Sequence, residues 1–178
     1  LGCAAIGFTI YPGSDMALDM FEEIVEMRKE AAAKGVATVI WSYPRGEAIT
    51  KDGETAIDIA AYAAQIAALV GAHIIKIKLS TDHLMLPEAK KVYEDKKIDV
   101  ATQAKRVAHC MEASFNGRRI VVFSGGAAKG ADAVFDDARA IRDGGGNGSI
   151  IGRNSFQRSR EDALEMLQKL VDIYLDKA

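Results

Sequence analysis

The sequence predicts an α/β fold in which a parallel sheet is covered by helices. Five short apolar runs alternate with five longer segments whose apolar residues recur at helical spacing. Each apolar run leads into a loop or turn that contains glycine, serine or proline. Strict alternation of strand and helix is typical of a parallel sheet with helices packed on it. Because no linker, repeat or low-complexity stretch interrupts the pattern, we expect residues 1–178 to form a single domain.

In the first two strand–helix units, residues such as proline, glycine and serine mark where the elements begin or end. Residues 4–10 are an apolar run that ends in Tyr-Pro-Gly-Ser, which indicates a strand followed by a loop. Residues 16–34 mix apolar residues with Glu and Lys at helical spacing, and Gly35 ends this amphipathic helix. Residues 36–43 form the second strand. The alanine-rich stretch 55–70 is the second helix, and its first residue, a threonine, is the expected cap.

The third unit begins with residues 73–80, which follow a helix-ending glycine and alternate apolar with polar. Residues 80–97 form a longer connection of mixed charge, with a proline that can open a short helix. Residues 99–115 have apolar positions on one side and predict a helix that Asn-Gly ends.

The last two units follow the same pattern. Residues 118–123 are the fourth strand, which leads into Ser-Gly-Gly, and residues 132–142 are the helix behind it. Residues 149–152 are a short fifth strand, reached through three glycines. Residues 160–175 are a terminal helix with leucines on one stripe.

Composition narrows the class of protein. The chain is 49% hydrophobic and 27% charged, with a formal net charge of -2, so no basic field is available for nucleic acid or a membrane surface. Cys3 and Cys110 form no disulfide framework or metal spacing, and the three histidines are scattered. We therefore expect a cytoplasmic protein with reduced cysteines and no bound metal. The start, Leu-Gly-Cys, has no initiating Met and no signal peptide pattern, and we expect a chain entered in the middle.

The third strand carries the first chemical signal. Its alternation places Ile75 and Ile77 on one face and Lys76 and Lys78 together on the other. Two neighbouring ammonium groups in a low dielectric favour the loss of a proton from one of them. A free amine can form a Schiff base with a carbonyl substrate. The alternative is an edge strand whose lysines lie in water and discourage aggregation, and strand geometry alone does not choose between the two lysines.

The second strand carries a second signal. By alternation, Val39, Trp41 and Tyr43 share one face. If that face lines a pocket, Tyr43 is a phenol beside a tryptophan wall, and a positioned tyrosine can transfer a proton to or from a substrate hydroxyl. The alternative is a Trp–Tyr core pair whose polar tips are satisfied within the fold.

The ends of the last two strands suggest a phosphate site. Glycines let backbone N–H groups approach a phosphate closely, and an arginine can form two parallel hydrogen bonds with it. The alternative at each glycine is a tight turn. Lys129 and Arg45 can each neutralise a phosphate, or can be a solvated lysine and a locally paired arginine. No P-loop or dinucleotide-binding pattern is present in a strand–turn–helix context. The expected phosphate ligands are Ser124, Gly125, Gly126, Gly152 and Arg153.

Five motifs in this order, T-I-Y-P-G-S, W-S-Y-P-R-G, G-A-H-I-I-K-I-K, F-S-G-G-A-A-K-G and G-S-I-I-G-R-N-S-F-Q-R, resemble those of the archaeal-type class I fructose-1,6-bisphosphate aldolases, which also occur in bacteria. The resemblance spans nearly the whole chain, and residues 103–158 look closest to the bacterial branch. It implies a glycolytic and gluconeogenic lyase in which Lys76 forms the Schiff base, Tyr43 is the general acid/base and Trp41 lines the site. It also implies the phosphate ligands named above, no metal or other cofactor, and a homo-oligomer, often a decamer.

The family's fold is a (β/α)8 TIM barrel, and this chain departs from it in length. Five strands would be the fourth to the eighth of the barrel, with Lys76 on the sixth. We therefore expect the C-terminal portion of a longer protein, without the acidic active-site residue that the family carries near its N-terminus. Two alternatives remain: a sibling Schiff-base aldolase or transferase acting on another phosphorylated ketose, and a non-catalytic scaffold that binds a phosphosugar.

Overall fold

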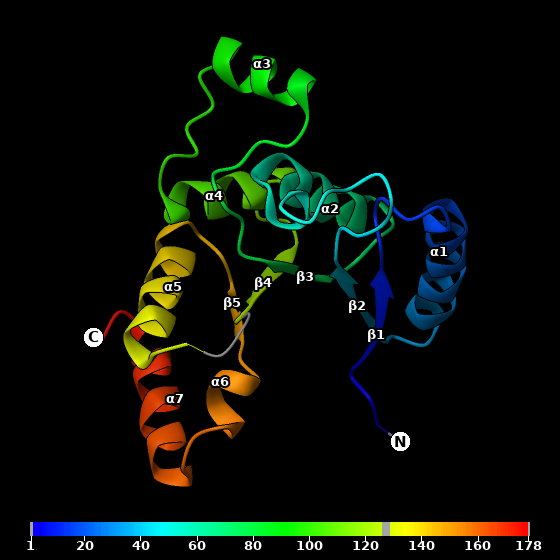
Figure 1. The fold of residues 1–178 in the computed structure, drawn as a ribbon. Coiled ribbons are helices and arrows are strands. Elements are labelled where there is room, and N and C mark those ends of the chain that lie inside the picture. Colours follow the sequence, from blue (N-terminus) through cyan, green and yellow to red (C-terminus); the bar gives the residue numbers. More distant parts are fainter. Residues whose placement is uncertain (1, 126–128, 178) are drawn as a thin grey trace.

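A parallel sheet forms the centre of the computed structural model, which describes residues 2–125 and 129–177 (Figure 1). Its order, β1-β2-β3-β4-β5, follows the chain without reversal. That order is the winding of a β/α barrel, whereas a doubly wound sheet reverses its order at a switch point. The strands are β1 (Ala5–Ile10), β2 (Ala37–Ser42), β3 (Ile74–Lys78), β4 (Ile120–Ser124) and β5 (Gly148–Ile150).

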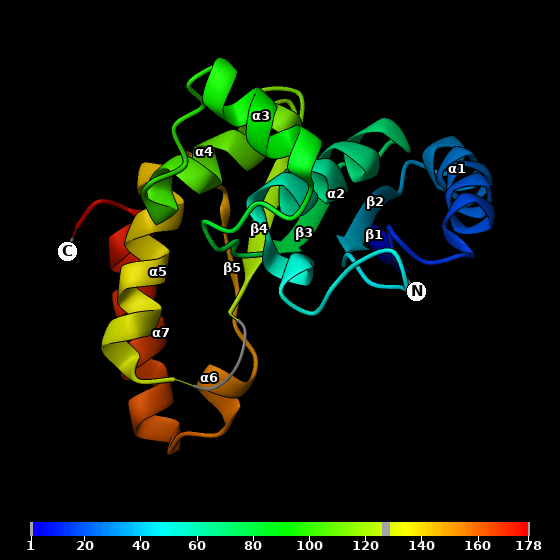
Figure 2. The same ribbon diagram turned by 45° about the horizontal axis from the view of Figure 1, so that its top comes forward.

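Helices cover the outer side of the curved sheet (Figures 1 and 2). Helix α1 packs on β1 and β2, α2 on β2 and β3, and α5 on β5, while α7 packs on α5. Helix α3 stands away from the sheet in both views. The helices are α1 (Ala17–Ala33), η1 (Gly53–Thr55, a 3-10 turn), α2 (Ile57–Leu69), α3 (Pro87–Asp95), α4 (Gln103–Ala113), α5 (Ala131–Asp143), α6 (Arg153–Phe156) and α7 (Arg160–Tyr174).

The main core lies between the sheet and these helices. Every second residue of the central strands is buried there, including Ile40, Ile75 and Phe123. Alanines fill the facing side of α2, so this helix lies close to the sheet. Each fully buried isoleucine stabilises the fold by roughly 1.5–3 kcal/mol. The same alternation leaves the other face of each strand less buried, and that face carries the polar residues discussed below.

The five strands and five helices predicted from the sequence are confirmed within a few residues, and two predicted starts are wrong. The second helix is capped by Ala56, because Thr55 ends the 3-10 turn and its carbonyl accepts the N–H of Thr81. The helix predicted over residues 99–115 is α4, which begins at Gln103 because the hydroxyl of Thr102 accepts a backbone N–H and caps it. The short helix α6 was not predicted, and α3 is the short helix allowed for in the long connection.

In the part of the chain that the structure describes, no helix is both long enough and apolar enough to cross a bilayer.

Candidate active site

A cleft of about 740 Å³ opens at the carboxyl ends of β2, β3, β4 and β5. In a parallel α/β sheet these ends lie on one side, where such folds bind their ligands. The structure thus brings together residues that are far apart in the sequence. The predicted site residues that line the cleft are Tyr43, Arg45, Lys76, Ser124, Gly125, Gly152 and Arg153.

Lys76 lies on a central strand and faces this cleft. Strand β3 pairs with β2 on one side and β4 on the other, so the edge-strand alternative is wrong. Ile75 and Ile77 are buried under the helices, which confirms that the lysines share the opposite face. The Nζ atom of Lys76 lies 6.0 Å from the centre of the Tyr43 ring. The amine and the phenol therefore lie beside each other in one cleft.

The two lysines of β3 differ in their partners. The Nζ atom of Lys78 lies 3.0 Å from Oε2 of Glu54, a residue of the 3-10 turn. The other carboxylate oxygen of Glu54, Oε1, lies 2.9 Å from the Nζ atom of Lys51. The hydrogen bonds from Lys51, and next from Lys78, hold the pKa of Glu54 below its usual value. Within the described residues, no carboxylate lies at ion-pair distance from Lys76.

Trp41 lies two residues before Tyr43, and its ring lies over β1. It is opposite Thr9 of β1 and Lys76 of β3 in the strand register, and it is not among the residues that line the cleft. Its ring covers Gly7, where an added Cβ would come within 2.0 Å of the indole. Gly7 is therefore the residue that makes room for the ring. A role for Trp41 in lining the substrate site stays a prediction.

The side of the cleft where a phosphate is predicted to bind, called the anion side below, is built from two strand ends. Ser124 and Gly125 close β4, and Gly152 and Arg153 follow β5. The backbone N–H of Gly125 donates to the carbonyl of Ile150 at 3.1 Å, which holds the two strand ends together. Gly126, the remaining expected phosphate ligand, lies outside the described residues. The binding of a phosphate here stays a prediction.

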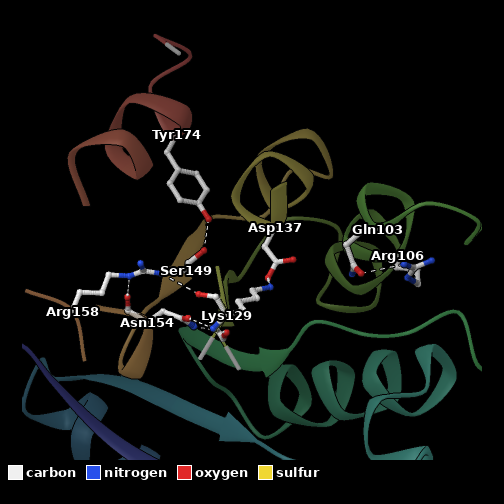
Figure 3. Close-up of polar contacts among 9 residues, drawn as sticks. Gln103, Arg106, Lys129, Asp137, Ser149, Asn154, Arg158 and Tyr174 are labelled. Carbon is white, nitrogen blue, oxygen red and sulfur yellow. Dashed lines mark hydrogen bonds and ion pairs between the residues drawn. The ribbon is translucent and has the colours of Figure 1, made fainter. Parts of the chain in front are cut away.

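Arg45 and Lys129 both line the cleft. The guanidinium of Arg45 lies 5.7 Å from the centre of the Tyr11 ring. The ammonium of Lys129 forms an ion pair with Asp137 of α5 (Figure 3). Both cations are therefore held near the cleft by neighbours, and Asp137 adds a carboxylate to its wall.

Sequence reasoning missed three residues that organise this region. Glu54 was overlooked because nothing in its loop indicates a contact with a strand that follows much later. Asn154 and Arg158 were overlooked because they sit in the unpredicted helix α6 and just beyond it. The only available signal was an asparagine among polar residues directly after the glycine and arginine at the end of β5. Among the described residues, no group of three His, Cys, Asp or Glu side chains is arranged to hold a metal ion.

The winding of the sheet, with an amine and a phenol in a cleft at its carboxyl edge, is consistent with the class of β/α-barrel proteins, which bind their ligands at the strand ends. The model of the DeoC/LacD family of aldolases matches residues 1–158. The chain belongs to this family.

Curated relatives carry names that agree with this membership. The fructose-bisphosphate aldolase class 1 of Thermoproteus tenax is 33% identical over 174 residues, which cover 97% of this chain and 56% of the relative. A probable fructose-bisphosphate aldolase class 1 of Chlamydia muridarum is 30% identical and covers 99% of this chain and 53% of the relative. The chain therefore spans little more than half the length of the relatives it matches.

Solved structures of similar fold also carry names that agree with membership of this aldolase family. An archaeal fructose 1,6-bisphosphate aldolase superposes with a TM-score of 0.78 at 32% identity, over 97% of this chain and 58% of that protein. Another archaeal enzyme, whose catalytic lysine is covalently bound to the carbinolamine intermediate of its substrate, has a TM-score of 0.78 at 30% identity, over 97% of this chain and 59% of that protein.

Proposed function

We propose that the protein containing this chain is a class I fructose-bisphosphate aldolase that acts through a Schiff base on Lys76. The observation that carries the proposal is the contrast between the two lysines of β3. Lys76 lines the cleft beside Tyr43 without a carboxylate partner in the described residues, whereas Glu54 pairs with Lys78. The Lys78 side chain is held by an ion pair, so Lys76 is the better candidate for the amine that attacks a bound ketone. The names of the relatives support the same reaction.

The chemistry assigned to the two residues is as follows. The amine of Lys76 adds to the ketone of fructose 1,6-bisphosphate, and loss of water gives an iminium ion. The C3–C4 bond then breaks, its electron pair moves into the iminium to give an enamine, and Tyr43, as the general base, takes the proton of the C4 hydroxyl. Glyceraldehyde 3-phosphate leaves. Protonation of the enamine at C3 and hydrolysis release dihydroxyacetone phosphate and the free amine.

The anion side of the cleft suits one phosphate of this substrate. Backbone N–H groups beside glycines and an arginine fork are the groups that bind phosphate in such sites. We assign Ser124, Gly125, Gly126, Gly152 and Arg153 to it. We assign the second phosphate to Arg45, which follows β2 and lines the same cleft.

The architecture completes the proposal. The five strands are assigned as the fourth to the eighth of a (β/α)8 barrel, so that residues 1–178 are one domain's C-terminal portion and Lys76 lies on the sixth strand. In the described chain β1 and β5 each pair on one side only, as strands do where the rest of a barrel joins. The share of each relative that the chain covers supports this assignment. We further assign the whole protein to the cytoplasm, to glycolysis and gluconeogenesis, and to a homo-oligomer, with a decamer suggested by the resemblance.

A second candidate is a sibling Schiff-base enzyme for another phosphorylated ketose. It is favoured by a relative from Methanocaldococcus jannaschii, 28% identical over 96% of this chain, whose name joins fructose-bisphosphate aldolase to 6-deoxy-5-ketofructose 1-phosphate synthase. A scaffold that binds phosphosugar without reaction is the remaining candidate. It predicts that Lys76→Met leaves ligand binding and function unchanged.

Steady-state kinetics on the longest natural chain that contains these residues test the proposal. We expect cleavage of fructose 1,6-bisphosphate with a higher kcat/KM than for ketose monophosphates, and loss of cleavage to the detection limit in Lys76→Met. Preference for a monophosphate would favour the sibling enzyme. Tight binding of the bisphosphate without cleavage would favour the scaffold.

A further inference from the structure

One buried side chain joins the loops that follow β4 and β5. Asn154, at 3% exposure, lies in α6 directly after Gly152 and Arg153. Its Nδ2 donates to the carbonyl of Gly125 at 3.1 Å, and its Oδ1 accepts the backbone N–H of Lys129 at 2.8 Å (Figure 3). A single amide therefore holds both the end of β4 and the chain just ahead of α5.

Arg158 strengthens this connection from one turn further on. Its Nε donates to the carbonyl of Asn154 at 2.7 Å, and its terminal nitrogen donates to the carbonyl of Lys129 at 3.0 Å (Figure 3). Hydrogen bonds from a charged donor are stronger than those between neutral groups. The guanidinium thus fixes Lys129 and Asn154 relative to each other, and we call these two side chains the Asn154–Arg158 bridge.

The two side chains of the bridge contact residues that line the cleft but do not line it themselves. Gly125, Lys129, Gly152 and Arg153 line the cleft, whereas neither Asn154 nor Arg158 does. The four lining residues come from two segments that are separate in the chain, and their spacing depends on how those segments are held. An anion site tolerates little error in the spacing of its donors, because hydrogen bonds weaken steeply as their length and angle change.

We propose that Asn154 and Arg158 are positioning residues that set the distance between the two halves of the anion site, and so determine how strongly the protein prefers phosphorylated over unphosphorylated substrates. The inference rests on the proposed function, since it takes the bound anion to be a substrate phosphate. Removal of the Asn154 amide leaves a partly buried N–H and a partly buried carbonyl without these partners. The backbone bond from Gly125 to Ile150 and the Arg158 side chain are then the contacts named here that still connect the two segments.

The test compares phosphorylated with unphosphorylated ligands in the longest natural chain. In Asn154→Ala we expect KM for fructose 1,6-bisphosphate and the inhibition constant of inorganic phosphate each to rise at least about tenfold, as expected for loss of aligned charge-assisted hydrogen bonds. The rate at which unphosphorylated dihydroxyacetone and borohydride label the protein is expected to change less than about twofold, because the amine is untouched. Arg158→Lys, which keeps the charge but not the fork, is expected to show a smaller change in the same direction.

Asn147→Ala is the matched control. Asn147 also bonds a backbone group of β4, the N–H of Val121 at 2.8 Å, but at the far end of the strand. Its loss is expected to lower stability without changing phosphate affinity. An equal loss in Asn154→Ala for phosphorylated and unphosphorylated ligands would overturn the inference, and so would an unchanged phosphate constant in both Asn154→Ala and Arg158→Lys.

Calorimetric titration with inorganic phosphate separates this inference from the aldolase proposal. Weaker phosphate binding in the Asn154 variant upholds the bridge even if the wild-type protein cleaves no sugar. Unchanged binding overturns the bridge and leaves the aldolase proposal standing if wild-type cleavage is observed.

Discussion

The Nζ atom of Lys78 lies 3.0 Å from Oε2 of Glu54, while Lys76, two residues earlier on the same face of β3, has no such partner in the described chain. Alternation along a strand makes the two lysines equivalent, and the 3-10 turn before α2 makes them different. The carboxylate holds the Lys78 ammonium in an ion pair, whereas the Lys76 side chain lines the cleft without one. The proposal of Lys76 as the nucleophile thus rests on a residue of a neighbouring loop.

The first prediction concerns this ion pair. In Glu54→Gln, Lys78 loses the carboxylate that holds its side chain, so both lysines can reach a ketone in the cleft. We expect borohydride trapping with dihydroxyacetone phosphate to give a measurable fraction of adduct on Lys78, located by peptide mass mapping. Lys51→Met is the control, because it removes the other partner of Glu54 but leaves the Lys78 pair in place. An adduct confined to Lys76 in the Glu54 variant would contradict the role given to Glu54.

The second prediction concerns Tyr43. Because the phenol is assigned to proton transfer and not to Schiff-base formation, Tyr43→Phe is expected to lower kcat by about 10²–10⁴-fold while borohydride trapping of dihydroxyacetone phosphate continues. Tyr11→Phe is the control, since that phenol is not among the residues lining the cleft. Loss of trapping together with turnover would show that Tyr43 supports the structure of the site instead of the proton transfer.

The third prediction tests the position of Trp41. A methyl group at Gly7 would lie 2.0 Å from the indole ring, so Gly7→Ala must displace it. We expect a loss of about 1–3 kcal/mol in the free energy of unfolding and a shift of tryptophan emission, which has a single source in this chain. Gly130→Ala, where an added Cβ meets no neighbour, is expected to leave the emission unchanged. An unchanged spectrum in Gly7→Ala would place the ring elsewhere.

The general fold was predictable from local patterns, because each depends on residues close in sequence. Alternation at Ile75 and Lys76 gave the two faces of β3, and glycine and proline marked most element ends. The grouping of Tyr43, Lys76 and Ser124 in one cleft followed from the rule that carboxyl ends of parallel strands meet at one edge.

The remaining features depend on contacts between distant residues. Glu54 reaches Lys78 across 24 positions, and Asn154 reaches Gly125 across 29. Neither contact leaves a period or a motif in the sequence, since it depends on where a short turn or helix points a side chain. The contact of Trp41 with Gly7 is of the same kind: alternation gives the face of the sheet that carries the ring, but not the neighbour that the ring covers.

The fourth prediction is a pH dependence of stability. His109 accepts or shares a hydrogen bond with the hydroxyl of Tyr93 at 2.7 Å and lies 3.7 Å from Glu112. Burial lowers the pKa of His109 below its usual 6.5, although Glu112 opposes this shift. Its contribution to stability is therefore complete above pH 6.5 and is lost as the pH falls through the lowered folded-state pKa, because the unfolded chain takes up the proton first.

Chemical denaturation between pH 7 and pH 5 checks this prediction. We expect the wild type to lose stability on acidification with a slope of at most about 1.4 kcal/mol per pH unit from this group, and His109→Gln to show a flatter profile. His83→Gln is the control for the removal of an imidazole as such, because His83 is exposed and lies outside the contacts of His109. Equal slopes in the wild type and His109→Gln would contradict the assignment.

The most direct test of the central claim is the site of the covalent adduct. The longest natural chain that contains these residues is incubated with dihydroxyacetone phosphate, reduced with borohydride and digested, and the modified peptide is sequenced by mass spectrometry. Our account predicts one adduct, on Lys76, that disappears in Lys76→Met and persists in Lys78→Met. An adduct on Lys78 in the wild-type protein, or no adduct on either lysine, would contradict it.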